Sequence, residues 1–145
     1  MLTDVDGTKR LEILAVEDNP GDAFLLKITL EAVRCPVHLT VVNDGEQAIE
    51  YLSTHGEQDT QPRPDLMLLD LNLPKKSGYE VLAAMRSDEA VSGIPVIVHS
   101  TSGEVNDIRR AMDLGAKVYI QKRLDMKDLK QLVNTIEAFR PAEAE

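Results

Sequence analysis

A short, unbroken apolar run that ends in a carboxylate most constrains what this chain can fold into. Leu66–Leu69 reads Leu-Met-Leu-Leu, with Pro64 just before it and Asp70 directly after it. An apolar run of this length beside a proline is typical of a strand buried on both faces. Ligands of open α/β sheets bind beyond the carboxyl ends of such strands, which is where Asp70 lies. Asp is also common in turns, so Asp70 alone fits the start of an ordinary loop equally well.

Apolar runs and amphipathic segments alternate along the whole chain, which predicts five β–α repeats. The expected strands lie at 11–16, 37–42, 65–69, 95–99 and 117–121. The expected helices lie at 22–34, 45–55, 79–86, 104–114 and 126–139, with Asp44 and Asp125 as N-caps of the second and the last. Strands that alternate with helices imply a parallel sheet with helices on both faces. The expected fold class is therefore α/β, a doubly wound parallel five-stranded sheet.

The length fits one domain with one hydrophobic core, because the chain has 145 residues. We expect this domain at 11–139, after a polar, flexible lead-in at 1–10 and before a disordered tail at 140–145. The N-terminus lacks the basic start and apolar centre of a signal peptide, and no apolar run approaches the roughly 20 residues that span a bilayer. The sequence thus predicts a soluble, cytoplasmic protein that does not enter a membrane.

Charge and composition exclude several classes of partner. The formal net charge is −9, which argues against binding to a phosphate backbone. Aromatic residues make up 3% of the chain and Trp is absent, so stacking platforms for nucleic-acid bases are not expected. The single cysteine, Cys35, allows no internal disulfide and forms no metal-binding pattern.

Charged and hydroxyl side chains follow four of the five expected strands. Glu17 and Asp18 come after the first, Asp70 after the third, Ser100 after the fourth and Lys122 after the fifth. In a sheet ordered 2-1-3-4-5 the first and third strands are neighbours, so their carboxyl ends bring the three carboxylates into one pocket. Carboxylates at so short a distance repel one another unless they are protonated or bridged by a cation. Oxygen ligands without His or thiolate favour Mg²⁺, and Lys122 would balance part of the remaining charge and meet a phosphoryl group.

Taken together, these positions resemble those of a response-regulator receiver domain. The matching residues are Glu17, Asp18, Asp70, Pro74, Gly78, Ser100, Tyr119 and Lys122. The resemblance covers residues 11 to about 139 and implies a flavodoxin-like (βα)5 fold with strand order 2-1-3-4-5. Segments 16–22 and 63–76, with the longer polar loop before Arg63, resemble more narrowly the response regulators of cyanobacterial and bacterial phytochromes.

The resemblance implies a phosphoryl acceptor and a metal site. Asp70 would accept a phosphoryl group from a phosphohistidine on a sensor histidine kinase, phytochrome-like in the narrower likeness, or exchange it with a phosphotransfer protein. Asp18 and Asp70 would bind Mg²⁺ with the backbone carbonyl of Asn72, and Glu17 would act directly or through a metal-bound water. Phosphoryl transfer needs mainly positioning and charge neutralisation, which a carboxylate, Mg²⁺ and a lysine provide.

The same resemblance assigns a switch. Ser100 would hydrogen-bond the phosphoryl group in the active state, Tyr119 would turn inward when Ser100 moves, and Lys122 would form an ion pair with the aspartyl phosphate. Tyr119 also fits a half-buried strand aromatic with no further role.

Ser100 stands where many receivers carry Thr and keeps the hydroxyl, and two further positions depart from the receiver pattern. Arg123 follows Lys122 where receivers usually carry a proline joined by a cis bond. A non-proline cis bond costs about 2.5–4 kcal/mol, so we predict a trans Lys122–Arg123 bond. His99 lies in an otherwise apolar strand, and we expect a packed or edge residue there rather than a metal ligand.

Three functions compete on these residues. The first is a phosphoacceptor switch that acts through a partner or through a homodimer formed by the fourth and fifth helices and the fifth strand (the α4-β5-α5 face). The second is an aspartate-nucleophile phosphatase, which needs a second Asp two residues after the nucleophile; Asn72 occupies that position and cannot act as a general acid. The third, a pseudo-receiver scaffold, is disfavoured because every acidic position is intact. We therefore expect no enzyme activity on outside substrates, with slow loss of its own phosphoryl group left open.

Overall fold

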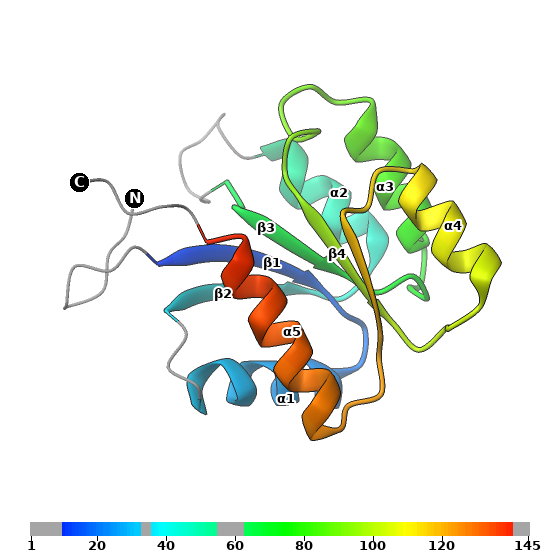
Figure 1. Cartoon of the computed structure of the whole chain (residues 1–145). Helices are drawn as coiled ribbons and strands as arrows, with labels where there is room; N and C mark the ends of the chain where they lie inside the picture. Colours follow the sequence, from blue (N-terminus) through cyan, green and yellow to red (C-terminus); the bar gives the residue numbers. More distant parts are fainter. Residues whose placement is uncertain (1–9, 33–35, 55–62, 141–145) are drawn as a thin grey trace.

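Five parallel strands and five helices alternate in the computed structural model, which describes residues 10–32, 36–54 and 63–140 (Figure 1). The strands are β1 (Leu11–Val16), β2 (Val37–Val42), β3 (Leu66–Leu69), β4 (Val96–Ser100) and β5 (Val118–Gln121). The helices are α1 (Pro20–Ala32), α2 (Gly45–Thr54), α3 (Gly78–Arg86), α4 (Val105–Asp113) and α5 (Met126–Ala138). The order β2-β1-β3-β4-β5 in the sheet confirms the predicted doubly wound topology.

Several predictions fall on residues that the structure does not describe. The lead-in at 1–9, the tail at 141–145, Cys35 and most of the polar loop before Arg63 lie outside the described residues. Arg140, which we assigned to the tail, is described, and its Nη1 donates a hydrogen bond to the carbonyl oxygen of Pro36 at 2.9 Å. This hydrogen bond links the segment after α5 to the residue that precedes β2.

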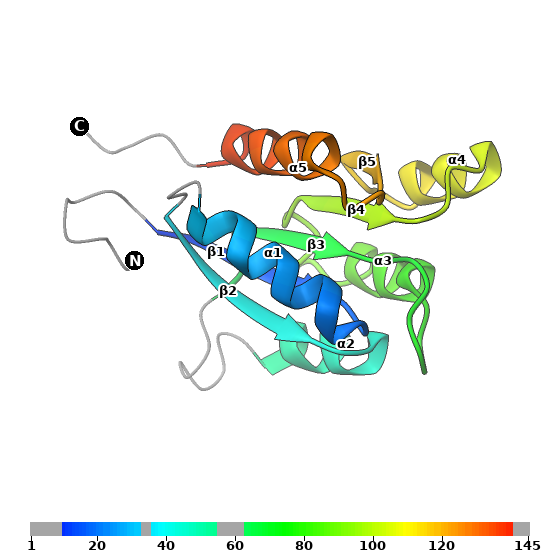
Figure 2. The same ribbon diagram turned by 90° about the horizontal axis from the view of Figure 1, so that it is seen from below.

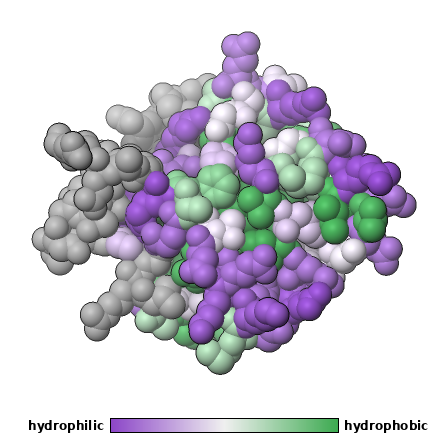
Figure 3. Space-filling model, in the orientation of Figure 1, coloured by the Kyte–Doolittle hydropathy of each residue, from purple (hydrophilic) through white to green (hydrophobic). Residues whose placement is uncertain are grey.

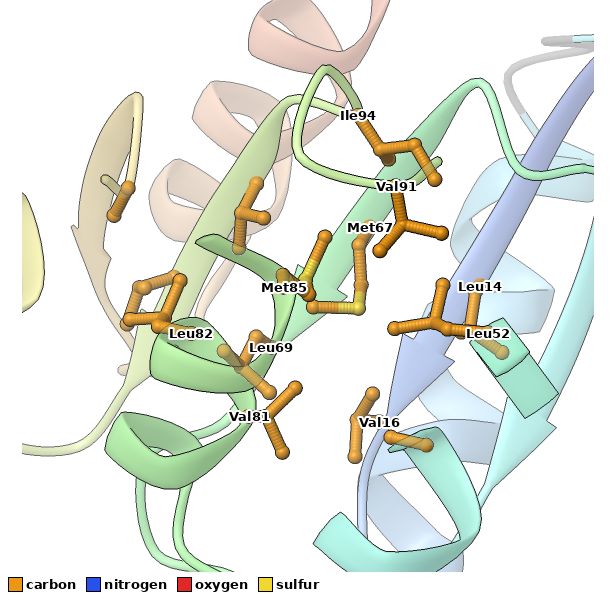
Figure 4. Close-up of a cluster of buried hydrophobic side chains, with 14 of the residues drawn as sticks. Leu14, Val16, Leu52, Met67, Leu69, Val81, Leu82, Met85, Val91 and Ile94 are labelled. Carbon is orange, nitrogen blue, oxygen red and sulfur yellow. The ribbon is translucent and has the colours of Figure 1, made fainter. Parts of the chain in front are cut away.

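The central strands are buried on both faces of the sheet. Helices α1 and α5 cover one face, and α2, α3 and α4 lie on the other (Figures 1 and 2). Alternate residues of β3 divide between two cores: Leu66 and Leu68 pack toward α1 and α5, whereas Met67 and Leu69 pack toward α2 and α3 (Figure 4). A strand covered on both faces requires an unbroken apolar run. Because Leu69 is buried, Leu69→Ala should lower the free energy of unfolding by about 2–5 kcal/mol.

The start of α1 differs from the prediction. The helix begins at Pro20, two residues before the expected Asp22. Proline fits the first position of a helix because the missing amide hydrogen would have no partner inside the helix there. The Asn19 side chain accepts a hydrogen bond from the Asp22 amide at 3.1 Å, which caps the helix. Proline and glycine after β1 therefore open a helix here rather than a loop.

The predicted helix caps are confirmed. Asp44 accepts a hydrogen bond from the Gln47 amide at 2.7 Å, and Asp125 accepts one from the Asp128 amide at 2.8 Å. Gly115 follows α4 with φ +110°, a conformation that favours glycine. Met126, the first residue of α5, is 77% exposed.

The visible surface is largely hydrophilic, with small hydrophobic patches, one of them over α4 (Figure 3). Val105 and Met112 of α4 are 66% and 41% exposed, and Phe24 of α1 is 64% exposed. Among the described residues, no helix combines the length and the apolar character that crossing a bilayer requires.

Candidate functional site

The carboxylates predicted to converge do so at the carboxyl ends of β1 and β3. Val16 pairs with Leu69 in the parallel ladder, so the residues that follow them, Glu17 and Asp70, are neighbours. One oxygen each from Glu17, Asp18 and Asp70 lies within 4.8 Å of the other two. Asp18 is exposed, whereas Asp70 is only 9% exposed. Three oxygens at this separation form an open, acidic pocket of the kind that holds a hard divalent cation.

Lys122 neutralises part of the negative charge of this pocket. Its Nζ donates hydrogen bonds to Asp70 Oδ2 at 3.0 Å, to Asp22 Oδ2 at 3.3 Å and to Glu17 Oε1. The lysine side chain is only 3% exposed. Burial lowers the pKa of Lys122, but the Glu17 hydrogen bond and the negative charges of Asp70 and Glu17 outweigh it and raise that pKa above its usual value. The ammonium group is therefore charged throughout the physiological range.

The same surroundings also raise the pKa of Glu17, but for a different reason. Burial raises the pKa of its carboxyl group, and the Lys122 hydrogen bond and charge offset that effect only in part. Glu17 also accepts a hydrogen bond from the Asn19 amide at 3.1 Å, which fixes the carboxylate beside the start of α1. The pocket thus holds one carboxylate, Glu17, whose ionisation the folded protein disfavours until a cation balances it.

Asp22 belongs to this group of charges, and the sequence did not reveal it. It lies in the first turn of α1, and its Oδ2 is 3.3 Å from Lys122 Nζ. An acidic residue in a first helical turn is common because it interacts favourably with the helix dipole. That ordinary explanation leaves no sequence signal for a second role.

The loop after β3 holds Asp70 in place. The Asp70 amide donates to the Val16 carbonyl oxygen at 3.2 Å, and Asp70 Oδ1 accepts from the Asn72 amide at 3.1 Å. Gly78 packs so closely on this loop that a Cβ there would lie 2.7 Å from the carbonyl oxygen of Asp70 and from Leu71 Cα. The glycine after Asp70 is therefore required by a close backbone approach.

Ser100 and Tyr119 meet at the loop after β4. Ser100 is fully buried, its carbonyl oxygen accepts from the Lys122 amide at 2.5 Å, and its Oγ accepts from the Ser102 amide at 3.5 Å. The hydroxyl of the half-buried Tyr119 donates to the Ser102 carbonyl oxygen at 2.7 Å. Ser102 thus joins the predicted switch serine to the predicted switch tyrosine.

Comparisons with known proteins decide the family. A model of the response regulator receiver domain matches residues 13–134. The chain belongs to the response regulator receiver family. Members of this family are phosphoacceptors in two-component signalling and bind divalent metal. The flavodoxin-like fold with strand order 2-1-3-4-5, which the resemblance to receivers implied, is thereby confirmed.

Two relatives, Rcp1 and RcpA, place this receiver more closely. Response regulator Rcp1 of Synechocystis is 39% identical over 127 residues, which cover 88% of this chain and 86% of that protein. The crystal structure of the phosphorylated cyanobacterial phytochrome response regulator RcpA is 42% identical with a TM-score of 0.80, over 94% of this chain and 98% of that chain. The Mn²⁺-bound form of Rcp1 is 38% identical with a TM-score of 0.78, over 91% and 99%. The predicted likeness to phytochrome response regulators is confirmed.

A second polar network connects the switch loop of the receiver to α3 and α4. Asp107 accepts hydrogen bonds from Ser102 Oγ at 2.5 Å and from the Tyr79 hydroxyl at 2.7 Å. Burial, followed by the hydrogen bond to Asp107, raises the pKa of Tyr79 to about 12. The Arg110 guanidinium lies 3.9 Å from the centroid of the Tyr79 ring. These residues were not singled out from the sequence, since contacts across 28 positions leave no local pattern.

The two departures from the receiver pattern, Arg123 and His99, both contact the carboxylate of Asp128. Cis peptide bonds are absent from the described residues, so the Lys122–Arg123 bond is trans, as predicted. His99 is half-buried, and its Nε2 lies 3.1 Å from Oδ1 of Asp128 in α5. Within the described part of the chain, the acidic pocket is the one group of three or more possible metal ligands, so His99 stays outside any such group.

Proposed function

We propose that Asp70 is the phosphoacceptor of this receiver. In our mechanism an Asp70 carboxylate oxygen attacks the phosphorus of a phosphohistidine, the P–N bond breaks, and the imidazole nitrogen leaves with the bond's electron pair and takes up a proton. The observation that carries the assignment is the convergence on Asp70 of Lys122 Nζ, at 3.0 Å, and of two further carboxylates within 4.8 Å. Phosphoryl transfer depends mainly on positioning and charge neutralisation, which this arrangement supplies.

We propose Mg²⁺ as the divalent ion of the pocket. Glu17, Asp18 and Asp70 provide oxygen ligands, and the Asn72 backbone carbonyl is the fourth protein ligand that we propose. The donor set fits because Mg²⁺ takes few carboxylates and retains several waters. When bound, the ion neutralises charge on the phosphoryl oxygens. Lys122, whose Nζ lies 3.0 Å from Asp70 Oδ2, would orient the same group through its ammonium.

Ser100 and Tyr119 form the proposed switch. The Ser100 hydroxyl is buried one strand away from Asp70 and now accepts from the Ser102 amide. A phosphoryl group on Asp70 offers that hydroxyl a stronger, charged acceptor, so Ser100 would turn toward it. The Ser102 loop would follow, and Tyr119, whose hydroxyl rests on the Ser102 carbonyl, would lose its present partner and turn inward.

Turnover on outside substrates is not part of this proposal. An aspartate-nucleophile phosphatase protonates its leaving group with an acid two residues after the nucleophile. Asn72 stands there, and its amide already donates from the backbone to Asp70 Oδ1. The proposed activity is therefore acceptance of a phosphoryl group, followed by slow hydrolysis in water.

The partner that we propose is a sensor histidine kinase, phytochrome-like by analogy with the relatives named above, or a phosphotransfer protein. Output would run through a protein partner or a homodimer on the α4-β5-α5 face, where Val105 and Met112 expose apolar side chains. Nucleic acid is not a proposed partner because the net charge is −9. Solution mass with and without a phosphoryl mimic tests the dimer; an unchanged monomer would contradict it.

One labelling experiment tests the phosphoacceptor. The protein is incubated with acetyl phosphate and Mg²⁺, and intact mass is measured for an added phosphoryl group. We expect one group on the wild type, none on Asp70→Asn, and none on the wild type when EDTA replaces Mg²⁺. Equal labelling of wild type and Asp70→Asn would exclude Asp70 as the acceptor.

A further inference from the structure

A second buried carboxylate, Asp128, lies outside the acidic pocket and has no part in the function proposed so far. It sits in the first turn of α5, only 4% exposed. Its Oδ2 accepts hydrogen bonds from the Arg123 amide at 2.9 Å and from the Leu124 amide at 2.7 Å. His99 of β4 contributes a third contact, Nε2 to Oδ1 at 3.1 Å. One side chain therefore links α5, the loop after β5 and the end of β4.

The loop that Asp128 holds is the one that carries Lys122. It connects Gln121, the last residue of β5, to Met126, the first of α5. Leu124 has φ +58°, in the left-handed region that is sparsely populated for residues other than glycine. Such a conformation persists only where its surroundings fix it, and the Asp128 carboxylate does so by accepting from the Leu124 amide. The loop has no proline to stiffen it, because Arg123 occupies that position.

His99 fastens the same carboxylate to the strand that carries the switch. It directly precedes Ser100, and the Ser100 carbonyl oxygen accepts from the Lys122 amide at 2.5 Å. Burial raises the pKa of Asp128, but hydrogen bonds from the Arg123 and Leu124 amides outweigh it, so the pKa is lowered and the carboxylate stays charged. Burial lowers the pKa of His99, which leaves a neutral ring that donates through Nε2–H.

We propose that the His99–Asp128 pair is a positioning device that holds Lys122 against the phosphoacceptor. The pair ties both neighbours of the functional residues, Arg123 after Lys122 and His99 before Ser100, to one carboxylate. The hydrogen bonds of the pair thus restrict the loop after β5, which a proline would stiffen through its ring. The inference rests on the proposed function of Asp70 and Lys122, and it adds two residues that touch neither the phosphoryl group nor the metal.

Weakening the tie, meaning the His99–Asp128 contact and its hydrogen bonds to the loop, should lower the rate of phosphoryl transfer and raise the affinity for Mg²⁺. Lys122 Nζ would spend less time near Asp70 and Glu17, so phosphoryl transfer would slow. Mg²⁺ would bind more tightly, since a cation that competes for the same carboxylates would be farther away. Complete removal of a unit charge about 4 Å away in watery surroundings would change the affinity for a divalent ion by about thirtyfold, and a partial displacement changes it by less. A general loss of stability would not strengthen metal binding while it slows transfer.

Four variants of the whole chain test the proposal. Asp128→Asn removes the charge and one acceptor, and His99→Val removes the donor with a residue suited to an apolar strand. His99→Gln keeps a donor. Asp125→Ala is the matched control, because the Asp125 side chain caps the same helix through the Asp128 amide and, among the hydrogen bonds of the described residues, makes none to residues 122–124 or to His99.

Mg²⁺ affinity is measured by titration without phosphodonor, and the rate of labelling by acetyl phosphate is measured across donor concentrations at saturating Mg²⁺. We expect Asp128→Asn and His99→Val to lower the maximal rate by about tenfold or more, short of the roughly hundredfold loss for a 1 Å misplacement. Their Kd for Mg²⁺ should fall about two- to fivefold. His99→Gln should stay near wild type, and Asp125→Ala should change neither quantity.

Hydrogen exchange of the Arg123 and Leu124 amides provides a readout without metal or phosphodonor, and it should quicken in Asp128→Asn. The proposal is overturned if Asp128→Asn and His99→Val behave as Asp125→Ala does, or if rate and Mg²⁺ affinity fall together. If Asp128→Asn does not fold, His99→Val decides alone. A wild-type protein that is not labelled on Asp70 would refute the proposed function instead, while the Mg²⁺ and exchange results would still report on the tie.

Discussion

Replacing Lys122 by methionine isolates what the buried ammonium does in the metal-free protein. Methionine has a similar length and no charge, so Lys122→Met leaves Glu17, Asp22 and Asp70 facing one another without a cation. In the wild type all three lie within hydrogen-bonding reach of Lys122 Nζ. We expect the variant to be destabilised without metal and largely restored by Mg²⁺.

The size of the effect follows from burial. Removing one partner of a buried ion pair costs about 3–5 kcal/mol, because the remaining charge is left uncompensated. The lower end applies here, since the side chains of Glu17 and Asp22 remain 11% and 23% exposed and water can reach them. At roughly 2–4 °C per kcal/mol for a protein of this size, about 3 kcal/mol lowers Tm by about 6–12 °C.

The assay is thermal unfolding followed by circular dichroism, in EDTA and again in saturating Mg²⁺. Lys130→Met, an exposed lysine on α5, is the control for loss of one positive charge and should change Tm little in either buffer. In Mg²⁺ the gap between Lys122→Met and wild type should narrow, because binding stabilises the variant more than the wild type. The prediction is wrong if Lys122→Met lowers Tm no more than Lys130→Met does in EDTA, or if Mg²⁺ leaves the Tm difference between Lys122→Met and wild type unchanged.

Three further predictions concern the same site. Burial raises the pKa of Glu17 above 4.5, so the metal-free wild type should lose stability relative to Glu17→Gln as pH rises through the pKa of Glu17 in the folded protein. This difference in the free energy of unfolding should vanish below pH 4.5. Urea unfolding across pH in EDTA measures the difference, and a value that does not change with pH would contradict the prediction. Tyr119→Phe removes the hydrogen bond to the Ser102 carbonyl oxygen and should lower the free energy of unfolding by about 0.5–1.5 kcal/mol in urea, whereas no change would show that the hydroxyl bonds water equally well. Gly78→Ala places a Cβ 2.7 Å from the Asp70 carbonyl oxygen and should cost about 1–3 kcal/mol and slow labelling by acetyl phosphate; normal labelling would mean that the Asp70 loop adjusts without harm.

The fold could be predicted because its strands carry a signal that tertiary structure does not override. Leu66–Leu69 is apolar at every position since both faces of β3 are covered, and no surface strand or amphipathic helix needs such a run. The boundaries were less predictable. Proline at a first helical position is well tolerated, and the Asn19 cap accompanies a start of α1 at Pro20 instead of at the predicted Asp22.

The site was predictable where backbone topology alone brings residues together. Glu17 and Asp70 follow paired strands, so their proximity requires only the strand order. Asp22, Asp107 and Asp128 were not foreseen, because each stands in the first turn of a helix, where an acidic residue already has an ordinary explanation. What gives them a further role is the side chain opposite each one, and that depends on how helices pack on the sheet.

The distribution of charge around Asp70 explains why Lys122 and a divalent ion complement each other. Without metal, one ammonium serves Glu17, Asp22 and Asp70 at once. A phosphoryl group on Asp70 would bring further negative charge and three acceptor oxygens, which Lys122 could not balance while it still neutralised Glu17. Glu17, Asp18 and Asp70 would hold a divalent ion, whose charge would leave the Lys122 ammonium free to bind the incoming phosphoryl group. We therefore expect the labelling rate to rise with Mg²⁺ occupancy in the wild type, whereas in Lys122→Met occupancy should rise at lower Mg²⁺ without restoring that rate.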